Sequence, residues 1–186
     1  QTSIEKIVLS DTVKNINRYA FYNATALNSI DLGNSLTQIG DNAFKNCKSL
    51  TEIDLPDTLV EIYDAAFENC SGLKGITVPE KITLIRPYVF KNCTGMKYVN
   101  LPDGLTTIQT YAFENCLFEE IDIPDTVTTM ASYAFRNCTK LFRVGYPASW
   151  NLTLDEGNRI NYYITRSPFY DCTALKEIIV DDGVTQ

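Results

Sequence analysis

Apolar residues return along this chain with a period of 23 residues. Phenylalanine marks the period most clearly, because it recurs within one short phrase, as in D-N-A-F-K-N-C at 41–47 and D-A-A-F-E-N-C at 64–70. The phenylalanine column comprises Phe21, Phe44, Phe67, Phe90, Phe113, Phe135 and Phe169. Its first four steps are 23 residues, the fifth is 22, and the last is 34, which is one period plus an insertion of 11. A fixed period of this length indicates a stacked-repeat protein.

One repeat unit reads L-x-x-I-x-L-P-x-x-L-x-x-I-x-x-x-A-F-x-N-C-x-x, and its parts predict different local structures. The alternating I-x-L segment predicts a short strand, which the following proline ends. The L-x-x-I segment predicts a second short extended piece, and A-F-x-N-C predicts one helical turn, α or 3₁₀. Because a unit this small cannot bury its apolar face alone, we expect the units to stack with their strands in a parallel sheet. The predicted fold class is an α/β solenoid, a single domain over 1–186 with about 7–8 coils.

One cysteine occurs in each of six units, and three interpretations are open. The column comprises Cys47, Cys70, Cys93, Cys116, Cys138 and Cys172, with Ala24 in the same position of the first copy. Six cysteines could form three disulfides or hold a metal. However, there is no C-x-x-C pair, one sulfur per coil cannot complete a zinc site, and parallel Cβ directions disfavour disulfides. We therefore expect a ladder of small, buried, free thiols.

An asparagine precedes the cysteine in most copies. The column comprises Asn23, Asn46, Asn69, Asn92, Asn115 and Asn137, with Asp171 last. We expect these side chains to point inward and to bond backbone groups of adjacent turns.

Composition excludes several functions. The net charge is −7 and the pI about 4.6, which argues against nucleic-acid binding through a basic face. No apolar run approaches the roughly 18–20 residues of a membrane span, so membrane insertion is not expected. The chain has no histidine, which removes Ser-His and Cys-His catalytic pairs and His-containing metal sites. We expect no catalytic residue, no metal and no cofactor.

The repeated text I-D-L-P-D-T-L at 53–59 and A-F-E-N-C at 66–70 resembles the leucine-rich repeats of the BspA-like bacterial class, over nearly the whole chain. The resemblance implies a right-handed solenoid with its parallel sheet on the concave face. It also implies surface or secreted proteins of host-associated bacteria and some protists, linked to adhesion and to binding host proteins. It brings no catalytic residues.

The middle residue of each I-x-L segment points away from the core and supplies a candidate binding surface. This column includes Asp31, Asp54, Thr77, Asn100 and Asp122. Asp31 and Asp54 are expected to be neighbours on adjacent strands, where like charges are unfavourable and a cationic partner or metal ion would relieve them. The alternative is a solvated acidic face.

A second surface column precedes the A-F pair and is rich in tyrosine. It comprises Tyr19, Asn42, Ala65, Tyr88, Tyr111 and Tyr133. Such a stripe either lines a binding surface or covers the edge of the core.

The strongest break in the repeat is the insertion at 148–167, which reads A-S-W-N-L-T-L-D-E-G-N-R-I-N-Y-Y-I-T-R-S. It holds the chain's single tryptophan, Trp150, together with Arg159, Tyr162 and Tyr163. Alternation on both sides of D-E-G-N-R predicts a projecting β-hairpin. Its role is either ligand binding or a local cover over the last coils.

The leading hypothesis is a non-enzymatic module at the bacterial cell surface or outside the cell, which binds host or extracellular proteins or glycans. A structural spacer without a ligand is the alternative, and a hydrolase based on paired carboxylates is the third. The chain starts and stops in mid-phrase and carries no export signal or anchor, so we expect it to be a fragment of a longer protein. Neither the ligand nor the oligomeric state follows from the sequence.

Overall fold

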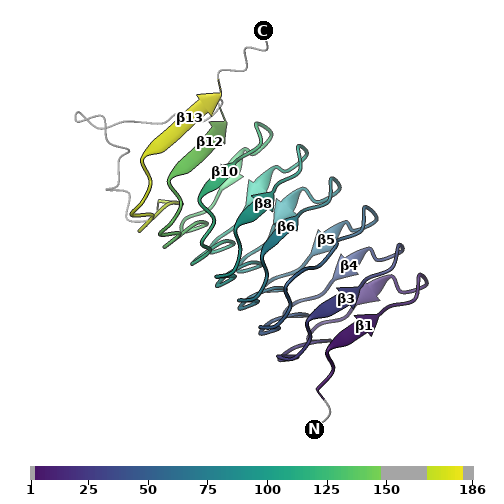
Figure 1. Ribbon diagram of the computed structural model, residues 1–186. Coiled ribbons are helices and arrows are strands. Elements are labelled where there is room, and N and C mark those ends of the chain that lie inside the picture. The colour runs from purple at the N-terminus through teal and green to yellow at the C-terminus, as the bar shows by residue number, and fades with distance from the viewer. Residues whose placement is uncertain (1–2, 148–166, 182–186) are drawn as a thin grey trace, which may run out of the picture.

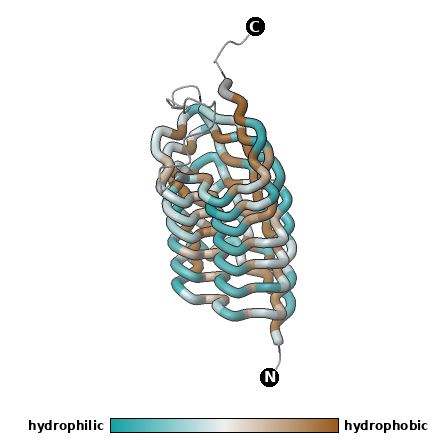
Figure 2. The backbone as a smooth tube through the Cα atoms, turned by 90° about the vertical axis from the view of Figure 1, so that its left-hand side faces the viewer, coloured by the Kyte–Doolittle hydropathy of each residue, from teal (hydrophilic) through white to brown (hydrophobic). Residues whose placement is uncertain are grey.

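The computed structural model describes residues 3–147 and 167–181, and these form a β-solenoid. The coils stack along one axis, with the first described coil at one end and the last at the other (Figure 1, Figure 2). The described residues contain no helix, and so none that could cross a membrane.

The coils contribute strands to two columns along the stack, although residues 53–55 form no strand in the first column. The first column contains β1 (Lys6–Val8), β3 (Ser29–Asp31), β6 (Gly75–Thr77), β8 (Tyr98–Asn100), β10 (Glu120–Asp122), β12 (Arg143–Pro147) and β13 (Glu177–Asp181). The second contains β2 (Asn15–Ile16), β4 (Gln38–Ile39), β5 (Glu61–Ile62), β7 (Leu84–Ile85), β9 (Thr107–Ile108) and β11 (Thr129–Met130). The I-x-L segment forms the first column and the L-x-x-I segment the second, so both predicted strands are confirmed.

The ladders between the described strands are all parallel, and their register follows the sequence period. Ile7 pairs with Ile30 in the first column, and Ile39 pairs with Ile62 in the second. Because the offset is a whole repeat, each apolar residue lies beside its counterpart in the next coil. This register confirms the predicted solenoid with a parallel sheet.

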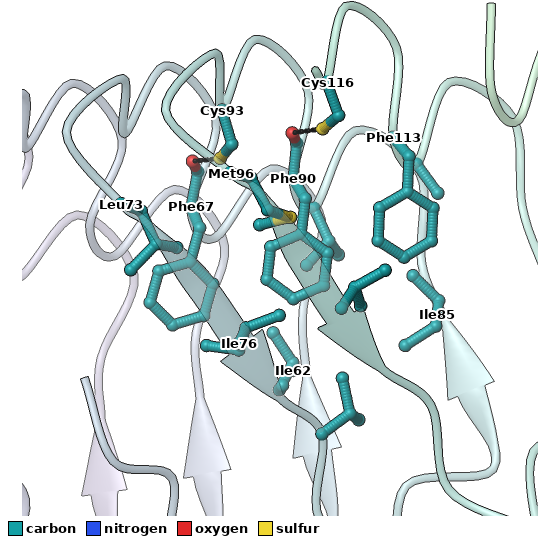
Figure 3. Close-up of a cluster of buried hydrophobic side chains, with 14 of the residues drawn as sticks. Ile62, Phe67, Leu73, Ile76, Ile85, Phe90, Cys93, Met96, Phe113 and Cys116 are labelled. Carbon is teal, nitrogen blue, oxygen red and sulfur yellow. Dashed lines mark hydrogen bonds between the residues drawn. The ribbon is translucent and has the colours of Figure 1, made fainter. Parts of the chain in front are cut away.

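The phenylalanine column forms the centre of the core. The rings of Phe44, Phe67, Phe90, Phe113 and Phe135 are fully buried. Consecutive rings along the column from Phe21 to Phe169 stack with centroids 5.1–5.7 Å apart. Figure 3 shows three of these rings in a row, with aliphatic side chains from both strand columns packed around them.

The A-F-x-N-C segment is not the helical turn that the sequence predicts. Within it, alternate amides bond different coils: the amides of Phe44 and Asn46 donate to carbonyls of the following coil, whereas those of Lys45 and Cys47 donate to carbonyls three residues back. A helix needs every amide for its own chain segment. Because the neighbouring coil takes every second amide, the segment forms a series of tight turns instead.

The asparagine column has a different structural role from the one expected. Its members and Asp171 lie in the left-handed region, with φ between 57° and 67°, where asparagine is among the few tolerated residues. Their side chains bond each other rather than the backbone: Asn69 Nδ2 donates to Asn46 Oδ1 at 2.7 Å, and Asn92 Nδ2 to Asn69 Oδ1 at 2.7 Å. The same bond runs from Asn23 to Asn137 and forms one continuous ladder.

Replacing Asn92 with alanine is expected to lower the free energy of unfolding by about 2–4 kcal/mol. Alanine does not favour the left-handed backbone angle of φ 60° at this position, and its side chain cannot make the two ladder bonds of Asn92. Asn92→Gly removes the same two bonds but tolerates the backbone angle. Urea unfolding of both variants separates the two contributions, and equal losses would contradict the backbone explanation.

The cysteine column is the ladder of buried free thiols that the sequence predicts. Each thiol donates to the phenylalanine carbonyl of the preceding coil: Cys93 Sγ lies 3.2 Å from the Phe67 oxygen and Cys116 Sγ 3.2 Å from the Phe90 oxygen (Figure 3). The amide of Cys70 donates to the same Phe67 oxygen within its own coil. One carbonyl oxygen therefore accepts hydrogen bonds from two coils. This bond explains why the column holds cysteine, whereas burial alone would be satisfied by another small apolar residue.

Candidate functional site

The predicted binding column lies on the exposed side of the first strand column. Asp31, Asp54, Thr77, Asn100 and Asp122 are all exposed. Thr77 and Asn100 are direct neighbours in the ladder, and Asn100 Nδ2 donates to Thr77 Oγ1 at 3.0 Å. We call this exposed side the strand face.

The strand face is interrupted where two aspartates were expected to be paired. Residues 53–55 continue the I-x-L pattern but form no strand, and Asp31 pairs with Val8 rather than with Asp54. The backbone bond from Thr51 N to Asn28 O is long at 3.5 Å, compared with 2.8 Å from Asn28 N to Glu5 O one coil earlier. Like charges on the outward positions disfavour close pairing at this point.

An exposed aromatic ring lies beside this interruption. Tyr98 is 53% exposed, although its ring rests against the backbone of Gly75, its partner in the ladder. A Cβ at residue 75 would come within 2.3 Å of the ring. Glycine at 75 therefore allows the ring to lie against the sheet with its other side open to solvent.

Tyr98 lies between two hollows on the strand face. The first, of about 240 Å³, is lined by Glu52, Asp54, Asp57 and Thr77 among others, and the second, of about 280 Å³, by Asn100, Glu120 and Asp122. Tyr98 contributes to both. Four of the five predicted surface residues thus surround one ring that the prediction did not include.

The two hollows differ in charge. In the second, Arg143 pairs with Glu120 at 3.0 Å and with Asp122 at 3.3 Å. In the first, Lys74 approaches Glu52 at 3.5 Å, while the described ion pairs leave Asp54 and Asp57 without a basic partner. The first hollow therefore keeps uncompensated negative charge next to an aromatic ring.

The tyrosine column lies in the turns that contain each A-F pair, and its rings contact other residues of the protein. Tyr88 stacks on Tyr111 at 5.4 Å, and Tyr111 on Tyr133 at 5.3 Å. Lys91 lies 5.4 Å from the centroids of the first two rings and 2.6 Å from the buried carboxylate of Glu114. Of its two sequence interpretations, this arrangement favours a cover over the core edge.

Trp150, Arg159, Tyr162 and Tyr163 of the insertion lie outside the described residues. The predicted hairpin and its binding role therefore stay predictions.

Tyr98 is the residue that sequence reasoning missed. It stands in an outward column otherwise occupied by charged or small residues: Lys6, Ser29, Glu52, Gly75, Glu120, Arg143 and Glu177. An aromatic residue exactly one period after a glycine was the available signal.

Stacked parallel strands with one repeated phenylalanine, asparagine and cysteine per coil define a bacterial-type leucine-rich repeat solenoid. The family model for the BspA type leucine rich repeat region matches residues 1–116 and 62–186, and the chain belongs to this family. Comparison with curated proteins gave no match.

Solved structures of bacterial leucine-rich repeat proteins are similar to this chain. A leucine rich cell surface protein from Faecalibacterium prausnitzii is 34% identical, with a TM-score of 0.72 over 78% of this chain and 41% of that protein. The T. pallidum leucine rich repeat protein is 27% identical, with a TM-score of 0.60 over 96% of this chain and 70% of that one. A leucine-rich repeat protein from Eubacterium ventriosum is 28% identical, with a TM-score of 0.61 over 80% of this chain and 46% of that one. The chain thus spans about two fifths of the Faecalibacterium protein.

Proposed function

We propose that the chain is a non-enzymatic binding module of a bacterial surface or secreted protein, with host or extracellular proteins or glycans as its ligands. The observation that carries the proposal is the exposed Tyr98 ring, held by Gly75 between two hollows. Tyrosine is enriched at binding surfaces because a rigid ring adds contact area at a small entropic cost. Family membership and the similar cell surface protein support the location.

On the strand face, the charges favour a protein ligand that presents lysine or arginine. Asp54 and Asp57 lack basic partners in the described structure, and a cation that enters the first hollow would also reach the ring of Tyr98. Both contacts would then act on one side chain of the ligand. Association with such a partner weakens as salt rises.

Replacing Tyr98 with alanine is expected to weaken ligand binding by about 10–30-fold, as for a central aromatic contact. The ligand is first identified by capture from host extracellular matrix proteins, and its affinity is then measured with the purified partner at low and high salt. Tyr22→Ala is the matched control, because Tyr22 is 42% exposed but lies in a turn rather than in the strands of the strand face.

The same panel separates the alternatives. Full binding by Tyr98→Ala together with loss in Trp150→Ala would contradict the strand-face assignment and favour the insertion. An absence of any ligand would favour the spacer.

A further inference from the structure

A groove runs along the asparagine ladder, lined by other residues than the two hollows of the strand face. It has a volume of about 600 Å³ and is lined by Asn46, Asn69, Asn92, Asn115 and Asn137, together with the residue two positions after each: Lys48, Ser71, Thr94, Leu117 and Thr139. From Asn46 to Asn137 the row covers four coil steps of about 4.8 Å each, or about 19 Å. The groove therefore has the length of an extended oligomer rather than of a single small molecule.

We propose that this groove binds the hydroxyl groups of a neutral, linear glycan chain. The asparagine side chains on its floor have unused hydrogen-bonding capacity. Each interior side chain, such as Asn69 or Asn92, donates one N–H to the preceding asparagine and accepts one from the following asparagine. A carboxamide has two N–H groups and two lone pairs. One donor and one acceptor per coil are therefore left.

The groove wall carries further unused polar groups. The hydroxyls of Ser71, Thr94 and Thr139 make no hydrogen bond within the described protein. Two other threonines of the repeat, by contrast, bond the backbone: Thr58 Oγ1 donates to the Leu36 carbonyl at 2.7 Å, and Thr126 Oγ1 to the Leu105 carbonyl at 2.7 Å. The asparagines are needed for the backbone angle, whereas these hydroxyls have no such role and are available to a ligand.

The chemistry of the lining selects a neutral polyhydroxylated ligand. Lys48 is the single charged residue among the ten, so a polyanion or a basic peptide would find no row of opposite charges. An extended peptide also needs pockets for alternate side chains, and Leu117 is the one apolar residue in the lining. A sugar unit presents neighbouring hydroxyls that both donate and accept, which matches one amide per coil. The ladder holds these amides in place before binding, which lowers the entropic cost of association.

The test uses neutral linear hexasaccharides, namely malto-, cello- and mannohexaose, with an anionic oligogalacturonate as comparison. Side-chain amide resonances of the asparagine column are followed by NMR, since they report the groove directly. We expect one or more neutral hexasaccharides to shift the resonances of Asn69, Asn92 and Asn115, and the anionic chain to have no effect. No shift of these amides by any neutral hexasaccharide at millimolar concentration would overturn the proposal.

The variant Ser71→Lys/Thr94→Lys fills the groove without changing the ladder, and Thr128→Lys is the control, because Thr128 is exposed outside the groove. The double variant is expected to bind about tenfold more weakly, the equivalent of one or two lost hydrogen bonds, with an unchanged melting temperature. Equal affinity of the double variant and the unmodified protein would refute the site. Tyr98→Ala should leave hexasaccharide binding unchanged, so failure here and failure of the strand-face proposal are distinguishable.

Discussion

Replacing Phe67 with alanine is expected to lower the free energy of unfolding by about 3–5 kcal/mol, the range typical of phenylalanine truncation in a packed core. Phe67 is fully buried, and its ring stacks between Phe44 at 5.2 Å and Phe90 at 5.7 Å. Removal of the ring leaves a cavity with an aromatic wall on each side. Both walls are held by their own neighbours, so the site cannot collapse and most of the cavity remains.

Phe21→Ala is the matched control for this substitution. Phe21 is only partly buried and stacks on Phe44, its neighbour towards the C-terminus. Its truncation removes one stacked contact instead of two, and solvent can fill part of the space. Urea unfolding of both variants should therefore give a distinctly larger loss for Phe67→Ala. Equal losses, or a loss below about 1 kcal/mol for Phe67→Ala, would contradict the central role of the column.

The large effect expected at Phe67 follows from the architecture. A coil contacts only its neighbours, so its stability is the sum of a small intrinsic part and two interfaces. A defect at Phe67 weakens the interfaces to Phe44 and Phe90 together. For this reason the repeat positions of an interior coil are more sensitive than the outward positions of the same coil.

Periodicity predicted the parts of the fold that depend on burial. The columns of Ile39, Phe44 and Cys47 are buried in the structure, except for the partly buried Phe21 and Met130, because stacking gives equivalent positions equivalent surroundings. Both strand columns, the parallel register and the free thiols followed from this one constraint. The prediction needed no knowledge of individual contacts.

Backbone conformation was predicted less well, because it depends on where amides bond. The helical turn was inferred from the shortness of A-F-x-N-C, which does not reveal that Phe44 and Asn46 donate to the next coil. The left-handed angle at Asn46 had a signal in its asparagine, since this residue type is enriched there. The same angle at Ala65 and Tyr88 had none, because their side chains do not favour it.

The strand-face site was predicted only in outline for a related reason. The outward direction of Thr77 and Asn100 follows from strand alternation, and both are exposed. The position of the Tyr98 ring depends on the absence of a side chain at Gly75 one coil away, which is a property of two residues in register. A comparison of residue size within each column would have identified Tyr98 beside Gly75, whereas the comparison of charge did not.

Alkaline pH is expected to unfold this protein steeply, because its buried thiols cannot ionise in place. Burial raises the pKa of Cys47 to about 11 and raises the pKa values of Cys70, Cys93, Cys116 and Cys138 well above their ordinary range. In the unfolded chain the same thiols ionise near pH 8.5. Below that pH the thiols are protonated in both the folded and the unfolded chain, so they do not make the free energy of unfolding depend on pH.

Above about pH 8.5 the unfolded chain releases thiol protons that the folded chain retains, so the unfolded state is stabilised and the free energy of unfolding falls. Each thiol contributes about 1.4 kcal/mol per pH unit until its folded pKa is reached. The four most buried thiols together give a slope of about 5–6 kcal/mol per pH unit. Since domains are typically stable by about 5–15 kcal/mol, two pH units are enough to remove most of the stability.

Urea unfolding under reducing conditions at pH 7.5, 9 and 10 measures this slope. The double variant Cys70→Ala/Cys116→Ala is the matched comparison, because the first copy already carries Ala24 in this position. At pH 7.5 the variant is expected to be the less stable protein, since it loses the bonds to the Phe44 and Phe90 carbonyls. Between pH 9 and 10 the thiol contribution to the slope should fall to about three fifths, because three of the five buried thiols remain. Lysine and tyrosine ionisation acts equally on both proteins, so parallel pH profiles would show that the thiols are not the groups that make this stack sensitive to base.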